Sequence, residues 1–326
     1  MIALSVLDLV PVREGSGVAE ALREAGQLAA CAERAGYRRF WIAEHHLSPG
    51  IAGGATSVAL AHVGHCTATI RIGAGGIMLP NHNPFVIAEQ FGALGALFPG
   101  RVDLGLGRAP GAAQILAHAL RKDLGRAAEY FPQDVIELRA LLTGDIDLPI
   151  QATPGFGAAV ELWMLGSSLF GAQLAAQLGL PYAFASHFAP DHLDAALETY
   201  RAQFRPSAAL DKPRVMAAMT VICADTDEEA ELLASSQDQS FVRLRSGDPG
   251  KLPPPVAGYR QSLPASAQAM LERLTVARAV GSPETVRARI ERFVERTRAD
   301  EIITSGATFD PTARRRSLEL TMKAVS

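Results

Sequence analysis

Glu44, His45 and His46 stand together directly after a short apolar run. A carboxylate beside two imidazoles can hold and exchange protons near neutral pH, and a histidine can also stabilise an oxygen anion. The same residue types bind metal ions, but no further carboxylate or histidine follows at ligand spacing. His62 and His82 are interpreted as helix-cap or surface residues. We therefore expect acid–base chemistry from Glu44 and His45, and no metal site.

A second group of residues could hold an anion. Ser167 and Ser168 follow Gly166 at the start of a predicted helix, whose free N–H groups and dipole favour negative charge. Either serine could instead do no more than cap that helix. Arg108 stands between two glycine-containing turns at a strand end, and its planar guanidinium can donate two parallel hydrogen bonds to a phosphate. Together these residues predict a site for a phosphorylated ligand.

Paired glycines mark a third position of interest. Gly75 and Gly76 follow the strand predicted at 70–73, where they would let a flat ring lie against the backbone or permit an unusual peptide bond. They could equally be ordinary loop glycines. Gly105 and Gly107 do not complete a dinucleotide-binding fingerprint, because the third glycine and the helix directly behind it are missing.

The elements that must position these residues alternate regularly. Strand and helix signals recur with a period of about thirty residues, which is typical of βαβ units. The strands are apolar throughout rather than alternating, as expected for strands that are buried on both faces. The predicted strands cover residues 2–7, 40–43, 70–73, 102–106, 160–165, 181–184, 215–223 and 301–304.

Such a series predicts a (β/α)8 TIM barrel, with residues 1–326 as a single domain and with insertions after strands 4 and 7. The insertions are the connection at 109–125, followed by a helix at 127–142, and the Pro- and Gly-rich segment at 246–264. An open doubly wound sheet is the alternative. In a barrel, reactive groups lie at the C-terminal ends of strands, which would gather the residues above, and His187 after the sixth strand, at one mouth.

Composition excludes several classes of partner. The formal net charge is −3 with acids and bases interspersed, so nucleic acid is not expected as a partner. The three cysteines are far apart and form no CxxC pair, which fits a reducing, cytoplasmic setting. The chain shows no basic leader and no apolar run near the roughly 18 residues of a membrane span, so no membrane partner is expected.

As a set, the motifs resemble the bacterial luciferase-like family of flavin-dependent monooxygenases, and most closely its single-chain alkanal-monooxygenase-like subgroup. The motifs that carry this resemblance are FWIAEHH at 40–46, IRIGAGGIMLPNHNP at 70–84, FPGRVDLGLGRAPG at 98–111, LGSS at 165–168 and LPYAFASHF at 180–188. The resemblance implies a homodimer that binds reduced FMN (FMNH2). A separate NAD(P)H:flavin reductase would supply this cofactor, and O2 would oxygenate an organic substrate such as an aldehyde or another carbonyl compound.

The resemblance also implies roles for single residues. His45 would be the catalytic histidine, and a cis peptide bond would join Gly75 to Gly76 beneath the flavin ring. The residues implied to contact the flavin are Gly75, Gly76, Arg108, Gly166, Ser167 and Ser168.

The sequence also departs from the family pattern. Gly166 replaces an acidic residue, residues 112–114 replace a Thr-Asp pair, and Gly107 stands where luciferases carry a reactive cysteine, so light emission is not implied. Two alternatives stay open: a deazaflavin-dependent enzyme that transfers hydride, and a flavin-binding protein without catalysis.

Overall fold

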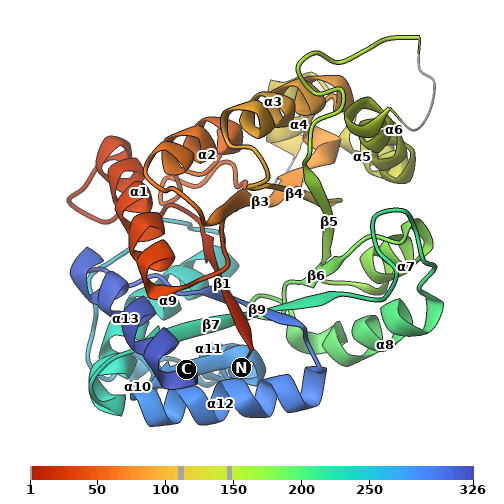
Figure 1. Cartoon of the computed structure of the whole chain (residues 1–326). Helices are drawn as coiled ribbons and strands as arrows, with labels where there is room; N and C mark the ends of the chain where they lie inside the picture. Colours follow the sequence, from red (N-terminus) through yellow and green to blue (C-terminus); the bar gives the residue numbers. More distant parts are fainter. Residues whose placement is uncertain (1, 109–113, 145–148) are drawn as a thin grey trace.

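The computed structural model describes residues 2–108, 114–144 and 149–326. Within these residues, eight parallel strands close into a barrel (Figure 1) in the order β6-β5-β4-β3-β2-β1-β9-β7, and pairing of β6 with β7 completes the ring. The strands are β1 (Ala3–Asp8), β2 (Arg39–Ile42), β3 (Arg71–Met78), β4 (Val102–Gly107), β5 (Glu161–Gly166), β6 (Tyr182–Phe184), β7 (Val215–Cys223) and β9 (Glu301–Ser305). The predicted TIM barrel is confirmed, and the open sheet is excluded.

Helices surround this barrel (Figure 1). They are α1 (Val18–Ala35), α2 (Thr56–His65), α3 (Pro84–Leu97), α4 (Gln114–Leu120), α5 (Leu124–Glu129), α6 (Phe131–Thr143), α7 (Leu169–Leu178), α8 (Leu193–Gln203), α9 (Asp227–Arg245), α10 (Tyr259–Ser262), α11 (Ala265–Arg273), α12 (Pro283–Thr297) and α13 (Pro311–Val325). None of the helices in the described residues is long and apolar enough to cross a membrane.

Local signals fix several helix ends where the sequence predicts them. Asn83 caps α3 by accepting a hydrogen bond from the backbone N–H of Phe85, and Pro84 occupies the first turn. Helix α1 ends at Gly36 with φ of 93°, and α7 ends at Gly179 with φ of 62°. These left-handed conformations favour glycine, because a side chain there would meet its own backbone.

Three parts of the predicted element series are wrong. Strand β3 does not stop before Gly75 but continues to Met78, with a register shift against β4 between Gly75 and Ile77. The helix predicted at 127–142 is two helices, α5 and α6, because Pro132 cannot donate the hydrogen bond that a continuous helix needs. A further strand, β8 (Arg278–Gly281), pairs with the last four residues of β7, beyond the point where β6 ends.

The interior of the barrel has two layers of different character. An apolar cluster fills the middle and contains Leu7, Trp41, Trp163, Ala183, Met216, Ala218 and Ile303. Below it, towards the N-terminal ends of the strands, lies a group of ion pairs that we call the charged plug. Its members are Ser5, Arg39, Arg71, Asp103, Glu161, Arg214 and Glu301. Arg39 and Trp41 are two residues apart on β2, so both side chains point inward.

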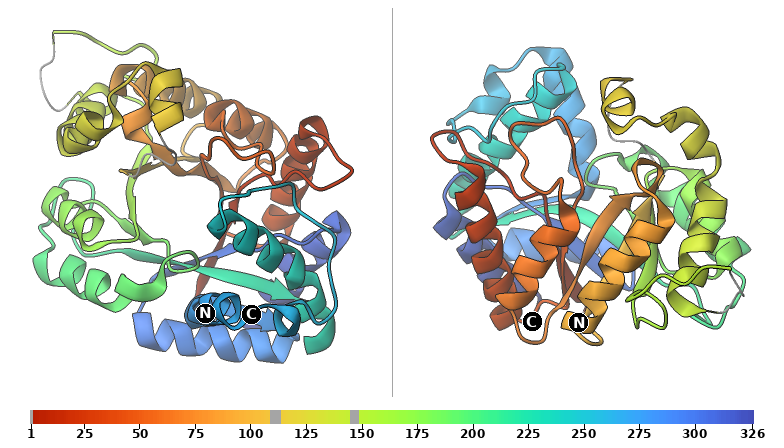
Figure 2. Two further views of the ribbon diagram at one scale, coloured as in Figure 1. Left: turned by 180° about the vertical axis from the view of Figure 1, so that it is seen from behind. Right: turned by 90° about the horizontal axis from the view of Figure 1, so that it is seen from above.

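The two predicted insertions flank the other end of the barrel. In the right-hand view of Figure 2, the segments after β4 (yellow) and after β7 (teal to light blue) rise on opposite sides of the end where the strands finish. The connection predicted at 109–125 lies partly outside the described residues, as do Ala112 and Ala113. The C-terminal mouth of the barrel is therefore walled by the segments that contain α4 and α5 on one side and α9 to α11 on the other.

Candidate active site

The Glu44 carboxylate is the centre of a hydrogen-bonded cluster directly after β2. Its side chain is buried, with the residue 3% exposed. Oε1 lies 2.6 Å from Nε2 of His46 and 2.9 Å from Nε2 of His82. Oε2 accepts the backbone N–H of Met78 at 2.9 Å, and the Asn81 amide donates to Oε1 at 3.3 Å. Both carboxylate oxygens are thus engaged, two of their partners being imidazoles.

Opposing effects set the charge of this carboxylate. Burial raises the pKa of the Glu44 carboxyl, but the hydrogen bonds and charge of His82, with those of His46 and the Met78 N–H, outweigh burial and lower it below its usual value. Glu44 is therefore ionised at neutral pH. An ionised carboxylate that faces two imidazoles can fix their orientation and stabilise a proton on either of them.

His45 is placed differently from its neighbours in the sequence. Its Nδ1 lies 3.2 Å from the carbonyl oxygen of His46, and because a carbonyl can only accept, this contact requires the proton on Nδ1. Burial is the largest effect on the His45 imidazole and lowers its pKa. At neutral pH the ring is uncharged, and its Nε2 carries the free lone pair. His45 can therefore accept a proton at Nε2.

The interpretation of His82 as a cap or surface residue is wrong. The 3₁₀ turn η1 (Leu79–Asn81) follows β3 and folds the chain back, so that the His82 ring reaches Glu44. The signal was present in the sequence, since LPNHNP follows the third strand directly, but only the path of η1 shows that His82 and Glu44 meet. His62, by contrast, is exposed on α2.

Three side chains of this cluster also meet the spatial requirement for a metal ion. Ligand atoms of Glu44, His46 and His82 lie within 4.8 Å of one another. Each is also engaged in the hydrogen bonds described above, and those contacts account for the geometry without an ion. The absence of a metal stays a prediction, which a chelation experiment can test.

The paired glycines lie in the wall of the barrel next to Glu44. The peptide bond between Gly75 and Gly76 is cis, as the resemblance implies. The Glu44 N–H donates to the Gly76 carbonyl at 3.3 Å, which links the two predicted site elements. An added Cβ would lie 2.6 Å from Leu7 Cδ1 at Gly75 and 2.6 Å from the Gly105 carbonyl oxygen at Gly76. Close packing inside the barrel therefore already requires both glycines.

The predicted anion-binding residues meet at the start of α7. Ser168 is the N-cap residue, with an extended backbone, but its side chain makes no capping hydrogen bond. The guanidinium carbon of Arg108 lies 4.0 Å from the centroid of the Phe170 ring, in the first turn of α7. Gly166 ends β5 and Ser167 follows it, half-buried. Arg108 therefore lies beside the first turn of α7, where a hydroxyl free of capping and the free N–H groups of the helix are also found.

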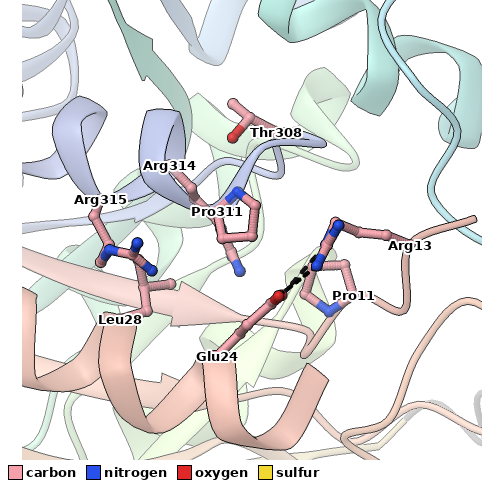
Figure 3. Close-up of a pocket in the computed structure, with 8 residues that line it drawn as sticks. All are labelled: Pro11, Arg13, Glu24, Leu28, Thr308, Pro311, Arg314 and Arg315. Atoms are coloured by element: carbon pink, nitrogen blue, oxygen red, sulfur yellow. Dashed lines mark hydrogen bonds and ion pairs between the residues drawn. The ribbon is translucent and has the colours of Figure 1, made fainter. Parts of the chain in front are cut away.

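Another hollow lies away from these residues (Figure 3). It occupies about 10 Å³ between α1 and the start of α13 and is lined by Pro11, Arg13, Glu24, Leu28, Thr308, Pro311, Arg314 and Arg315. An ion pair of 2.5 Å joins Arg13 to Glu24 across it. A volume of this size holds a single water molecule, so this hollow is no substrate site.

Comparison with known proteins gives consistent matches over the whole chain. Residues 2–301 match the family model described as luciferase-like monooxygenase. A luciferase-like monooxygenase of Escherichia coli (strain K12) is 48% identical over 322 residues, which cover 98% of this chain and 96% of the relative. The N-acetyl-S-alkylcysteine monooxygenase of Bacillus subtilis (strain 168) is 34% identical over 254 residues, covering 76% of this chain and 75% of the relative.

Solved structures share the fold. The crystal structure of apo-MsnO8 superposes with a TM-score of 0.88 at 34% identity and covers 99% of this chain and 98% of that one. The oxygenating constituent of 3,6-diketocamphane monooxygenase, solved with FMN, has a TM-score of 0.72 at 20% identity, covering 99% and 97%. An F420-dependent secondary alcohol dehydrogenase gives 0.72 at 15% identity, covering 100% and 99%. The last two likenesses show the fold alone.

Proposed function

Because this chain belongs to the luciferase-like monooxygenase family, we propose that it is the oxygenating component of a two-component monooxygenase that uses reduced FMN and O2. The observation that carries this proposal is the arrangement of the barrel mouth. An uncharged His45 and the ionised Glu44 cluster share that mouth with an arginine placed beside a helix N-terminus.

The described residues fit a flavin phosphate. Arg108 and the N-terminal turn of α7 provide positive charge and N–H donors, and Ser167 and Ser168 add hydroxyl groups. Among the described residues, the nearest atom that an added Cβ at Gly107 would meet is the Ile77 carbonyl oxygen, at 3.8 Å. No described side chain therefore crowds the backbone at the end of β4, beside the residues proposed to hold the phosphate. When bound, reduced FMN supplies the electrons that activate O2.

We assign separate tasks to the residues of the mouth. His45 holds or releases a proton at Nε2, next to the place where oxygen chemistry would occur. Glu44 orients His46 and His82 and holds the end of β3 through the Met78 N–H. The apolar cluster in the middle of the barrel, with Trp41 and Trp163 in edge-to-face contact at 5.5 Å, keeps water out from below.

The substrate in this proposal is a small organic molecule with an oxidisable carbonyl or thioether group. The carbonyl class follows from the resemblance to alkanal monooxygenases, and the thioether class from the name of the Bacillus subtilis relative. A separate flavin reductase, a homodimer and a cytoplasmic setting complete the proposal. The three cysteines are free thiols, as a reducing compartment requires.

An anaerobic titration with photoreduced FMN, followed by mixing with oxygenated buffer, tests the proposal. We expect tight binding of FMNH2 and an oxidation rate that His45→Ala changes by tenfold or more, while the exposed His62→Ala variant behaves like the parent. Binding without any effect of His45→Ala would favour a flavin carrier. Preferential binding of a deazaflavin, identified by mass spectrometry, would favour hydride transfer, and failure to bind either cofactor would contradict the site.

A further inference from the structure

Helix α9 lies at the C-terminal ends of β7 and β9. Gln237, near its middle, accepts the backbone N–H of Ala307 at 2.8 Å, just past the end of β9, and its amide lies 3.4 Å from the Thr220 hydroxyl. Phe241, one turn further, meets Phe188 of the β6–α8 loop with ring centroids 6.0 Å apart. The second half of α9 therefore faces the loop after β6, which lies across the barrel from β2, the strand that His45 follows.

His187 lies in that loop and has no assigned task in the proposed function. Within the described residues, neither of its ring nitrogens makes a hydrogen bond, and Nδ1 is shielded from solvent. Burial lowers the pKa of His187 to about 4, yet part of the side chain stays accessible. A ring that is deep in the protein and still accessible lines an opening, and an unpaired buried nitrogen calls for a partner. A bound ligand can supply that partner.

Arg245, at the end of α9, sits at the rim of the same opening. Its guanidinium carbon lies 4.6 Å from the centroid of the Phe188 ring and 5.1 Å from that of Phe241. No carboxylate pairs with it among the described residues, whereas Arg243, two positions earlier, is paired with Glu14 at 3.1 Å. Phe188 is 41% exposed. The rim therefore offers an oriented, unpaired cation beside an accessible aromatic surface.

We propose that His187, Phe188 and Arg245 form the substrate-binding side of the mouth and select an organic substrate that carries an anionic group. The anionic group of the substrate, such as a carboxylate, pairs with Arg245. The apolar part of the substrate lies against Phe188. A polar atom of the substrate, nearer the reacting centre, forms a hydrogen bond with the uncharged His187. The proposal rests on the proposed function for the place of reaction. The substrate in the name of the Bacillus subtilis relative, an N-acetyl-S-alkylcysteine, carries a carboxylate of this kind.

Calorimetric titration with matched acids and amides tests this assignment. The probes are N-acetyl-S-benzylcysteine and octanoate, each compared with its primary amide, added to the protein alone and to the protein loaded with FMNH2 under anaerobic conditions. We expect each acid to bind roughly tenfold or more tightly than its amide. Arg245→Gln should reduce that preference to about twofold or less, and Arg243→Gln, whose arginine is already paired, should keep it. His187→Phe should weaken acid and amide alike.

Three results would overturn the proposal: equal binding of acid and amide, an equal loss of preference in Arg243→Gln, or no binding of either acid at millimolar concentration. These results are independent of the flavin chemistry, because the titration with reduced FMN reports separately on the cofactor site. Arg245 is exposed, so its substitution leaves the fold intact, and a thermal unfolding curve of each variant verifies this.

Discussion

Two buried carboxylates at opposite ends of one barrel have different kinds of partner. Asp103, in the charged plug, accepts hydrogen bonds from Arg39 at 2.7 Å and from the Trp41 indole at 2.9 Å, and it is also paired with Arg71. Glu44, at the mouth, faces two imidazoles, an amide and a backbone N–H. Arginine keeps its proton at every working pH, whereas histidine does not.

The consequence is a division of labour along the barrel axis. In the plug, Arg39 also pairs with Glu301 at 3.0 Å, and the guanidinium carbons of Arg39 and Arg214 lie 4.9 and 4.8 Å from the centroid of the Trp163 ring. These charges are fixed and mutually compensated, so they hold strands together and perform no chemistry. The partners of Glu44 can gain and lose protons. A barrel whose C-terminal end carries the reactive groups is expected to show this asymmetry.

The largest expected effect comes from breaking the plug. Arg39→Met would leave Asp103 and Glu301 buried without their main counter-charge, so the free energy of unfolding should fall by about 3–5 kcal/mol in urea titrations. Arg296→Met is the matched control, because its pair with Asp194 is exposed and should contribute about 1 kcal/mol or less. Equal stability of the two variants would contradict the role given to the plug.

Glu44→Gln should affect activity more than stability, the opposite of what is expected for a substitution in the charged plug. The amide keeps the shape of the carboxylate but not its charge, so His46 and His82 lose the group that orients them. We expect oxidation of the substrate to fall by about 10²-fold or more, with a loss of unfolding free energy of about 1–2 kcal/mol. Oxygen uptake measures the activity of this variant, and urea unfolding of the same sample measures its stability. If Glu44→Gln lost as much unfolding free energy as Arg39→Met and kept full activity, Glu44 would have a structural role and no role in the reaction.

A fall in pH should affect the histidines at the barrel mouth and leave the arginines of the charged plug unchanged. His187 at the mouth has a folded pKa of about 4, below its unfolded value near 6.5. The unfolded chain therefore binds the proton more readily, and stability present above about pH 6.5 is lost as the pH falls towards 4, on the order of 3 kcal/mol. His187→Phe should make this slope shallower in unfolding measurements between pH 7 and 4, and the slope that stays includes the contribution of His45, whose pKa burial also lowers. The loss that the lowered pKa of Glu44 causes begins lower, below its unfolded value of about 4.3.

The sequence predicts the parts of this asymmetry that depend on local signals. The Asn83 cap and the glycine at the end of α1 each depend on a few neighbouring residues, and the strand period depends on segments of about thirty residues; all three are confirmed. Strand β8 was missed, although it has the same length as β2. Arg39 pairs with an acid 262 positions away, and no pattern within one strand identifies that partner.

In the candidate site, too, some features depend on local signals and could be predicted, and others depend on distant contacts and could not. Glu44, His45 and Arg108 could be chosen because each stands at a strand end, and that placement is confirmed. The contact of His82 with Glu44 joins residues 38 positions apart through the turn η1, whose direction depends on how far β3 extends. His187 was visible as a residue after a strand, but only its surroundings show that both ring nitrogens lack partners among the described residues.

The smallest expected effect is that of metal removal, and it tests whether the Glu44 cluster is held by hydrogen bonds alone. Dialysis against EDTA should change neither FMNH2 affinity nor the oxidation rate, because every ligand atom that a cation would use already has a hydrogen-bond partner. Zn²⁺ added afterwards would have to displace protons from His46 and His82 and should inhibit rather than activate. Activity lost on chelation and restored by Zn²⁺, in the parent but not in His82→Ala, would show that the mouth carboxylate is a metal ligand and not a proton-network residue.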